Sequence, residues 1–458
     1  MIFRNKTIKF LFFLILFISI NALLLNFIKC YYDSYTLTFD LNYDYNMERN
    51  YAMLDDFNNL EYVPYNHNIS IENLITGIQK DCTMDLCFDF SLCQNFKIYV
   101  YPDIQGVSVS DLLNKILSIL RQSRYYTDDP NKACLFIPSL DTLHRDALSP
   151  NFDRKLNFQI QSLPFWNKIG LNHLIFNFYA GTWPNYYEEE FHMNVYRALL
   201  AKASLSSASY RPFYDISMPL IHGTHSIYDK DTKSTFCSEN EQSHKRYLLV
   251  FKGKRYLHGV GSYSRDSLHL LHNKHDIILV TTCRHGQDWM RFADKNCDRD
   301  MVEYEKYDYN TLLHNSQFCL VPRGRRLGSY RFLEVLKAGC IPVMLSNDWI
   351  LPFSEVINWN DAVVWADERL IMQIPDLLRS ISHRKIAQYR VRIKFLWNTY
   401  FSSVEKITNT VIEIIRERVN IFHRNKLSWN LTPGGLFTNH SHTTLLQYLS
   451  SNITSVLC

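Results

Sequence analysis

The sequence predicts an α/β protein in which two doubly wound, Rossmann-like domains face each other across a cleft, preceded by one transmembrane helix. Three observations lead to this prediction. An uncharged apolar segment stands near the N-terminus, strand-like and helix-like patterns alternate along most of the chain, and the alternation begins again after a polar stretch at 222–244. The expected parts in chain order are a cytosolic tail (1–9), a transmembrane signal anchor (10–29), a stem (30–80), an N-terminal domain (81–240), a C-terminal domain (241–400), and a C-terminal helix and tail (401–458).

The N-terminal segment predicts the compartment. Arg4, Lys6 and Lys9 precede Phe10–Ile28, which holds nineteen residues without charge. That length spans a bilayer as a helix, and positive charge before the span keeps the N-terminus in the cytosol. A cleaved signal peptide is the alternative, but no small-x-small cleavage site closes the span. We expect an uncleaved, single-pass type II protein whose bulk is lumenal.

Composition and cysteine usage agree with a folded lumenal chain. Apolar residues make up 47% of the chain, and a net charge of +4 is too small and dispersed to indicate nucleic-acid binding. Eleven cysteines in this compartment predict a disulfide framework, although sequence alone leaves its connectivity open. Zinc binding is disfavoured because the spacings match no Cys/His zinc pattern. Four lumenal glycosylation sequons begin at Asn68, Asn430, Asn439 and Asn452.

Each strand and helix is expected from hydrophobic periodicity. The strands of the N-terminal domain are Phe96–Tyr101, Ala133–Ile137 and Asn172–Phe178, and its clearest helix is Val107–Arg121. In the C-terminal domain the expected strands are Tyr247–Phe251, Ile277–Thr281, Phe318–Val321, Ile341–Leu345 and Ala362–Trp365. The expected helices there are Asp266–His272, Tyr309–Asn315, Tyr330–Ala338 and Leu370–Ser382, followed by a long helical pattern over Arg384–Glu417 that should return to brace the N-terminal domain.

The unit formed by 318–345 is the most informative stretch. A basic loop, Pro322–Ser329, follows a buried strand and leads into a helix that Gly339 can end in a left-handed conformation. Helix N-termini at the carboxyl ends of strands bind anions, and arginine forks match phosphate or carboxylate oxygens. The unit therefore predicts an anion site served by Arg323, Arg325, Arg326 and Arg331. The structural alternative is that some of these arginines pair with core acids such as Glu334 or Glu355.

The same unit, together with YLLVFKGKRYLHGVGSYSRDSLH (247–269) and CDRDMVEYEKYDY (297–309), resembles the exostosin family of heparan sulfate polymerases. The likeness covers 81–435 and concerns the N-terminal glucuronosyltransferase half, glycosyltransferase family 47. The chain stops where the family's C-terminal N-acetylglucosaminyltransferase domain would begin, so a short form is expected. The resemblance implies a GT-B fold, with the N-terminal lobe binding the acceptor and the C-terminal lobe the nucleotide sugar. It also implies the disulfides Cys82–Cys87, Cys93–Cys134, Cys283–Cys297 and Cys319–Cys340.

A sugar nucleotide needs its diphosphate neutralised as it leaves, either by a metal or by fixed cations and helix N-termini. The candidate residues for the UDP-sugar are Lys252, Lys254, Arg284, His285, Arg323, Arg326, Tyr330, Arg331 and Glu334. Arg331 is the first choice for the diphosphate and counts as catalytic, Glu334 is expected to accept from the ribose hydroxyls, and Tyr330 to stack or bond near the uracil. For either lysine, a solvated surface charge is the alternative.

No metal is expected. Asp298 and Asp300, and likewise Asp229 and Asp231, match the Asp-x-Asp form of metal-using transferases. Such short matches are common by chance, and the resemblance points to the exostosin half that lacks a metal, so both are interpreted as structural. GVGSYS (259–264) imitates a dinucleotide fingerprint but lacks the third glycine.

An inverting transfer needs a general base near the acceptor hydroxyl. Asp141 leaves a buried strand toward the expected cleft and is the chosen base, with capping of the following turn as the alternative. His144 and Asn185 stand where the family has acidic residues, which weakens a catalytic role at those positions. Trp183 could stack on an acceptor sugar, although a core tryptophan is the plainer interpretation.

These observations predict an inverting, metal-independent transferase in the Golgi and endoplasmic reticulum membrane. It would move glucuronate from UDP-glucuronate, in β-1,4 linkage, to a heparan chain that ends in N-acetylglucosamine. The resemblance implies a heterodimer with another exostosin, which would supply N-acetylglucosamine transfer. The rival hypotheses are a catalytically weak scaffold for a partner polymerase and a transferase for other sugars.

Overall fold

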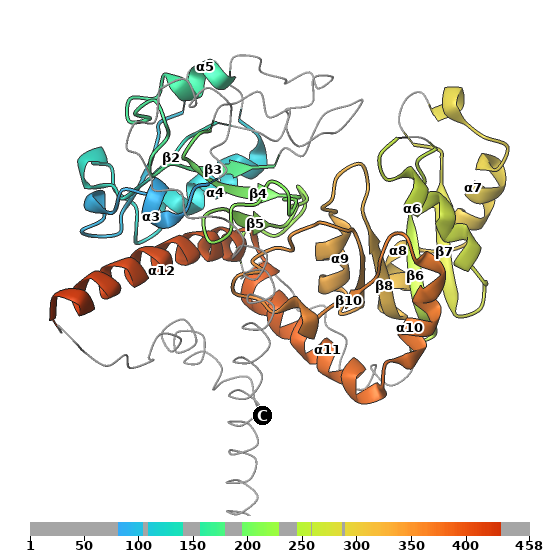
Figure 1. Cartoon of the computed structure of the whole chain (residues 1–458). Coiled ribbons are helices and arrows are strands. Elements are labelled where there is room, and N and C mark those ends of the chain that lie inside the picture. The colour runs from blue at the N-terminus through green and yellow to red at the C-terminus, as the bar shows by residue number, and fades with distance from the viewer. Residues whose placement is uncertain are drawn as a thin grey trace, which may run out of the picture. The chain divides into compact units, whose positions relative to one another are not determined.

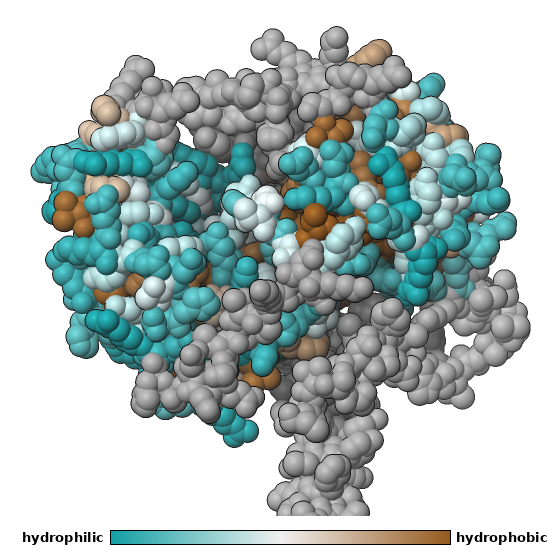
Figure 2. All heavy atoms as spheres, turned by 180° about the vertical axis from the view of Figure 1, so that it is seen from behind, coloured by the Kyte–Doolittle hydropathy of each residue, from teal (hydrophilic) through white to brown (hydrophobic). Residues whose placement is uncertain are grey.

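A computed structural model describes residues 81–103, 109–140, 156–178, 195–228, 245–257, 259–285 and 289–431. The chain divides into two units, residues 1–71 and 72–458, and every described residue belongs to the second. The architecture of this unit is α/β, with helices packed on parallel strands (Figure 1). Hydrophilic side chains cover most of the face in Figure 2, and the large apolar residues pack mainly into one extended core.

The first group of strands keeps its chain order. Its members are β1 (Ile98–Val100), β2 (Leu135–Ile137), β3 (Leu174–Asn177), β4 (Leu199–Ala203) and β5 (Ile216–Met218). Strand β1 pairs with β2, β3 pairs with β4 and β4 with β5, all in parallel, and a single parallel bridge from Phe136 to His173 joins the two sets. No reversal of strand order occurs among these described strands. The predicted double winding is therefore not seen in this half.

Helices of the first half are α3 (Met84–Cys87), α4 (Asp111–Arg121) and α5 (Leu156–Gln161). Helix α4 shows why the sequence forms a helix here. The Ser110 side chain accepts a hydrogen bond from the Leu113 amide at its start, and its leucines and isoleucines are buried on one face. The predicted periodicity of this segment is confirmed.

The second sheet is doubly wound, as predicted. Its parallel strands lie in the order β10-β9-β8-β6-β7. They are β6 (Tyr247–Lys254), β7 (Ile277–Thr282), β8 (Ser316–Pro322), β9 (Ile341–Leu345) and β10 (Val364–Trp365). The chain runs outward from β6 to β7 and then crosses back to β8 on the other side of β6. The order therefore reverses between β6 and β8, which is where open α/β sheets bind ligands.

Short helices lie between these strands and, in the case of α10, after the last of them. They are α6 (Ser262–Asp266), α7 (Cys297–Glu305), α8 (Tyr309–His314), α9 (Arg331–Lys337) and α10 (Ile374–Ser380). The predicted helix over Asp266–His272 is instead the end of α6 followed by a 3₁₀ segment at Ser267–Leu271. Gly339 adopts φ +66° after α9, so the predicted left-handed cap is confirmed.

The helical pattern predicted over Arg384–Glu417 is confirmed but interrupted. Helix α11 (His383–Leu396) runs into a π-helical segment at Trp397–Phe401, and α12 (Val404–Leu431) begins after Ser402 and Ser403. Trp397, Tyr400 and Phe401 are all buried, and the wider turn brings these large rings into the core together. Helix α12 then packs against α4 and β5, as expected of the last helix.

All four expected disulfides are present: Cys82–Cys87, Cys93–Cys134, Cys283–Cys297 and Cys319–Cys340. Among the described residues, no helix has the length and apolarity required to cross a membrane, and the expected span at 10–29 lies outside them. The sequons at Asn68, Asn439 and Asn452 also lie outside, while Asn430 belongs to the last turn of α12.

Candidate anion-binding site

The loop after β8 meets the loop after β6 at the point where the strand order reverses. Gly259 and Gly261 adopt φ +74° and +76° in the GVGSYS stretch. A Cβ on Gly259 would lie 2.6 Å from Nη1 of Arg325, and one on Gly261 would clash with the Gly324 carbonyl. The two glycines therefore allow close approach between the loops. GVGSYS departs from a dinucleotide fingerprint, yet it has the same structural task of bringing backbone close to a neighbour.

Arginine side chains gather at this reversal point. Arg265, at the start of the crossover from β6 to β7, is only 6% exposed. Its Nε donates to the Arg323 carbonyl (2.8 Å), and its Nη1 donates to the Lys254 carbonyl (3.0 Å). Burial lowers the pKa of Arg265 to about 10, and the nearby charges of Arg331 and Arg325 act in the same direction. The group still carries its charge at neutral pH.

Aromatic rings separate these cations. The Arg265 and Arg325 guanidinium carbons lie 4.8 and 4.5 Å from the Tyr256 ring centroid. That of Arg331 lies 4.5 Å from the Phe251 centroid. Neither Arg265 nor Arg331 forms a salt bridge with a carboxylate in the described part of the chain. Like charges that are held together without a direct carboxylate partner repel one another, so this arrangement favours an anionic ligand.

Arg331 is fixed by a second network, which uses both ends of its guanidinium. Nη2 donates to the Lys252 carbonyl (2.6 Å) and Nη1 to the Tyr309 hydroxyl (3.0 Å), while that hydroxyl donates to Glu334. Burial raises the pKa of Tyr309, so the phenol stays protonated. Gly253 makes this possible, because a Cβ there would lie 2.8 Å from Nη2 of Arg331. Arg331 and Glu334, both expected at the nucleotide-sugar site, are thus brought together through the Tyr309 hydroxyl.

Two of the arginines at this site keep buried donors available. The Nε atoms of Arg323 and Arg331 are buried, and neither has a hydrogen-bond partner among the described residues. A buried N–H without an acceptor is costly, and an acceptor from a ligand or from water would remove that cost. Oxygen atoms of a phosphate or carboxylate would satisfy them.

The other loop residues lie close by. Arg326 is half-buried, and its carbonyl accepts from the Gly324 amide (3.0 Å). Tyr330 stands at the start of α9 with 38% of its surface exposed, and its ring meets His222 edge-on at 5.6 Å. It remains accessible to a ligand.

The lysines of FKGKR differ from each other. Lys254, at the end of β6, is exposed beside the arginines. The ammonium of Lys252 lies 4.1 Å from the Tyr304 ring centroid and donates to the Tyr307 carbonyl, and burial lowers its pKa. Lys252 therefore contributes its backbone carbonyl to Arg331, while its ammonium contacts Tyr304 of α7 and the Tyr307 carbonyl that follows α7.

The surroundings of His285 disfavour its charged form. Its Nε2 lies 2.8 Å from the Arg255 carbonyl, to which it donates. Burial lowers the pKa of His285, and the charges of Lys254, Arg325 and Arg265 lower it further. The expectation that His285 adds positive charge to the site is not supported. Arg284 stacks on Trp289 and forms an exposed salt bridge with Asp298 (2.6 Å), so its charge is already paired with a carboxylate.

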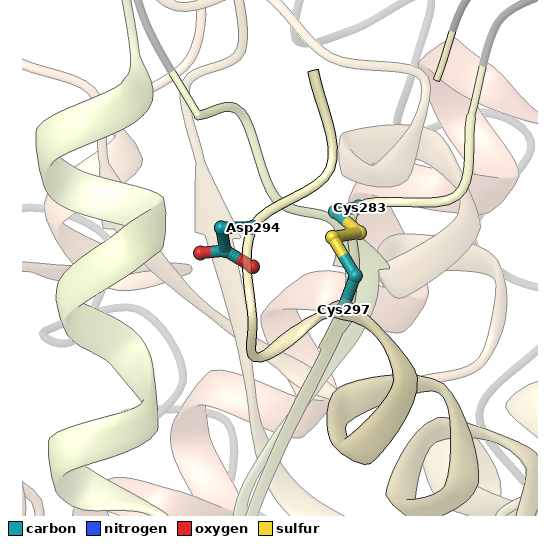
Figure 3. A group of neighbouring side chains, drawn as sticks. All are labelled: Cys283, Asp294 and Cys297. Atoms are coloured by element: carbon teal, nitrogen blue, oxygen red, sulfur yellow. A yellow bond between two sulfur atoms is a disulfide. The ribbon is translucent and has the colours of Figure 1, made fainter. Parts of the chain in front are cut away.

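Of the two Asp-x-Asp residues in α7, Asp300 joins a structural ion cluster, whereas Asp298 pairs with Arg284 outside it. The buried guanidinium of Arg255 binds Asp266 (3.0 Å), Asp294 (2.9 Å) and Asp300 (2.9 Å), and these acids hold its pKa well above its usual range. Beside this cluster, Cys283, Asp294 and Cys297 form a group with the spacing of metal ligands (Figure 3). The two sulfur atoms form a disulfide, and Asp294 is paired with Arg255, so this group offers no free thiolate.

Sequence reasoning missed Arg265, Tyr256 and Tyr309. The position of Arg265 four residues after Gly261, in a glycine-rich crossover at a strand end, was an available signal. Tyr309 sits in a pattern that indicated only a helix. The expected base Asp141 lies outside the described residues, as do His144, Trp183, Asn185, Asp229 and Asp231.

One protein family matches most of this chain in sequence. A profile described as "Exostosin GT47 domain" matches residues 92–381. Exostosin-1 of Bos taurus is 52% identical over 376 residues, which cover 80% of this chain and 49% of that protein. Exostosin-1a of Danio rerio is 52% identical over 381 residues, covering 81% and 51%. The chain spans about half the length of these curated relatives.

The similarity to solved structures is weak. A glycosyltransferase from Rickettsia africae ESF-5 is similar with 11% identity and a TM-score of 0.34, over 71% of this chain and 98% of that one. A likeness of this size adds nothing to the fold described above.

Proposed function

The chain belongs to the exostosin GT47 family, and on this premise we propose that it transfers glucuronate from UDP-glucuronate to a heparan-type chain ending in N-acetylglucosamine. The observation that carries the proposal is the cluster of Arg265, Arg325 and Arg331 at the reversal point of the second sheet. It has the charge, the buried donors and the fold position that a nucleotide diphosphate requires.

The chemistry follows from the charge. During transfer, the bond between the anomeric carbon and the β-phosphate oxygen breaks, and negative charge builds on the departing diphosphate. Guanidinium groups that are already fixed stabilise this charge without reorganising during the reaction. Arg331 is held by Lys252 and Tyr309, and Arg265 by three backbone carbonyls, so both are fixed before a ligand binds.

In the same proposal, the transfer inverts the anomeric configuration and needs no metal. Asp141 is the proposed base, and the two strand groups serve acceptor and donor as the lobes of a GT-B enzyme. The donor's own carboxylate would use a further cation, for which Lys254 and Arg326 are available. We place the protein in the Golgi and endoplasmic reticulum membrane, with an exostosin partner that supplies N-acetylglucosamine.

The test compares nucleotide binding with transfer. UDP and uridine are titrated calorimetrically into the wild type and the Arg325→Gln and Arg331→Lys variants. Transfer from UDP-glucuronate to an oligosaccharide ending in N-acetylglucosamine is measured in EDTA, with and without the partner. We expect each variant to weaken UDP about tenfold or more and to leave uridine unchanged. Wild-type protein that binds UDP no better than uridine would refute the diphosphate assignment. UDP binding without transfer under any condition would refute the enzymatic role and leave the scaffold hypothesis.

A further inference from the structure

Helix α11 carries a positive charge that nothing on the helix balances. Between Leu377 and Val404 the sequence contains no aspartate or glutamate. The same stretch contains Arg379, Arg384, Lys385, Arg390, Arg392 and Lys394. Arg379 forms a salt bridge with Asp276, whereas Arg384, Lys385 and Arg392 form none within the ranges that the structure describes. A surface helix with one sign of charge is a footprint for a polyanion.

The two long faces of α11 differ: the inner face is apolar and buried, and the outer face mixes apolar residues with cations. One face buries Ile386, Tyr389, Ile393 and Leu396 and packs on α9 and β9. The other face presents Arg384, Ala387, Gln388, Val391, Arg392 and Phe395, which line a surface depression of about 560 Å³. Their spacing of three and four residues places them in one stripe along the helix. Val391, in the middle of the stripe, is 71% exposed.

Rings partly order two cations of α11, Arg392 on this stripe and Lys385 outside it. The Arg392 guanidinium lies 5.2 Å from the Phe395 ring centroid, and the Lys385 ammonium lies 4.8 Å from that of Tyr389. Such contacts restrict the side chains before any partner arrives, which lowers the entropic cost of binding. Arg384 and Arg392 are eight residues apart, so about 12 Å of helix separates their Cα atoms.

We propose that the outer face of α11 binds an acidic polysaccharide at a second site, separate from the arginine cluster at the strand ends. A chain that bears a carboxylate on alternate sugars complements the row of cations, and the apolar C–H faces of its rings suit Val391 and Phe395. The identity of this polyanion rests on the proposed function. The surface would hold the growing chain near the enzyme between transfers and raise its effective concentration at the reacting end.

Two variants that place opposite charges at position 391 test the proposal. Because the Val391 side chain is largely exposed, both Val391→Glu and Val391→Lys should fold. Size-defined unsulfated polysaccharide of alternating glucuronate and N-acetylglucosamine is the probe, and binding to the full chain is measured over a range of salt. We expect Val391→Glu and the double variant Arg384→Gln/Arg392→Gln to lose fivefold or more in affinity. Val391→Lys should bind at least as well as the wild type.

Controls separate this surface from the reaction. Lys132→Gln/Lys274→Gln removes the same charge elsewhere and should leave polymer binding unchanged. Transfer to a short acceptor should be equal in the wild type and all these variants. Unchanged polymer binding in Val391→Glu would overturn the proposal, and equal loss in both Val391 variants would overturn the role given to charge, because the apolar contact alone would then hold the polymer. Absent transfer in every protein would count against the proposed function alone, because polymer binding is read independently of it.

Discussion

Arg418 of α12 joins Glu355 to the carbonyl oxygens of Tyr214 and Asp215. Its Nε lies 3.3 Å from Glu355 Oε1, Nη2 binds the other carboxylate oxygen, and Nη1 and Nη2 donate to the two carbonyls at 2.6 and 3.1 Å. The paired side chains are 9% and 13% exposed. One arginine thus fastens the last helix to the segments that precede β5 and follow β9.

Replacing Arg418 should therefore be severe. Arg418→Ala leaves a buried carboxylate and two carbonyl oxygens without their donor, and we expect a loss of about 3–5 kcal/mol in the free energy of unfolding. Arg416→Ala on the same helix removes a more exposed partner of Glu413 and should cost about 0–1 kcal/mol. Urea unfolding of both variants provides the comparison. Equal losses would contradict the structural role given to Arg418.

Gly261 should not tolerate a side chain. Gly261→Ala combines φ +76° with a clash against the Gly324 carbonyl, so the loops at the reversal point must separate. We expect a cost of about 1–3 kcal/mol together with weaker UDP binding. Gly223→Ala is the control, because nothing lies within 4 Å of a Cβ there. Full UDP affinity in Gly261→Ala would show that the loop contact is dispensable.

Buried His173 should make stability fall in acid. Its Nε2 accepts from the Tyr101 hydroxyl (3.0 Å), its Nδ1 donates to the Leu171 carbonyl (2.8 Å), and burial lowers its pKa to about 4. The unfolded state, with a pKa near 6.5, takes up the proton first as pH falls. Stability from this group is therefore complete above about pH 6.5 and declines toward pH 4, by at most about 1.4 kcal/mol per pH unit.

The measurement for His173 is the free energy of unfolding at several pH values. His173→Gln should remove this part of the slope between about pH 4 and 6.5. His275→Gln, at a side chain that is 92% exposed, should leave the slope as it is. An unchanged profile in His173→Gln would mean that other groups govern the acid response.

Tyr309 should support donor binding through Arg331 and Glu334. Tyr309→Phe keeps the ring but removes the hydroxyl that accepts from Arg331 and donates to Glu334. We expect UDP-glucuronate transfer to lose about tenfold in kcat/KM, since each network bond is worth about 1 kcal/mol. Tyr307→Phe, in the neighbouring turn, is the matched control. A loss confined to thermal stability would show that the network is structural only.

The sequence predicted the second sheet well because its strands are continuous apolar runs bounded by turns. Ile341–Leu345 agrees with β9 residue for residue. Strands β4 and β5 were not predicted, because the buried polar residues Lys202 in β4 and Ser217 in β5 interrupt their apolar runs. Periodicity also extended the helical prediction across Ser402 and Ser403. The α-helix is interrupted there because Trp397 and Phe401 pack into the core from a π-helical segment.

At the site, the loop arginines were predictable from their place between a strand and a helix N-terminus. The burial of Arg265 and the lowered pKa of His285 were not, because both depend on neighbours far away in sequence. The same is true of Lys252, whose ammonium contacts Tyr304 and Tyr307 in the connection from β7 to β8. Residue type predicted the kind of ligand, and packing decided which side chains face it.

The central place of β6 in the second sheet has a consequence for how the protein is made. One edge of β6 pairs with β7, which follows soon after it, but the other edge pairs with β8, which is synthesised only after α7 and α8. A nascent chain that has just completed β7 therefore exposes an unpaired row of amides and carbonyls beside apolar side chains. Until Ser316–Pro322 leaves the ribosome, that edge is a target for chaperones and for misplaced strands.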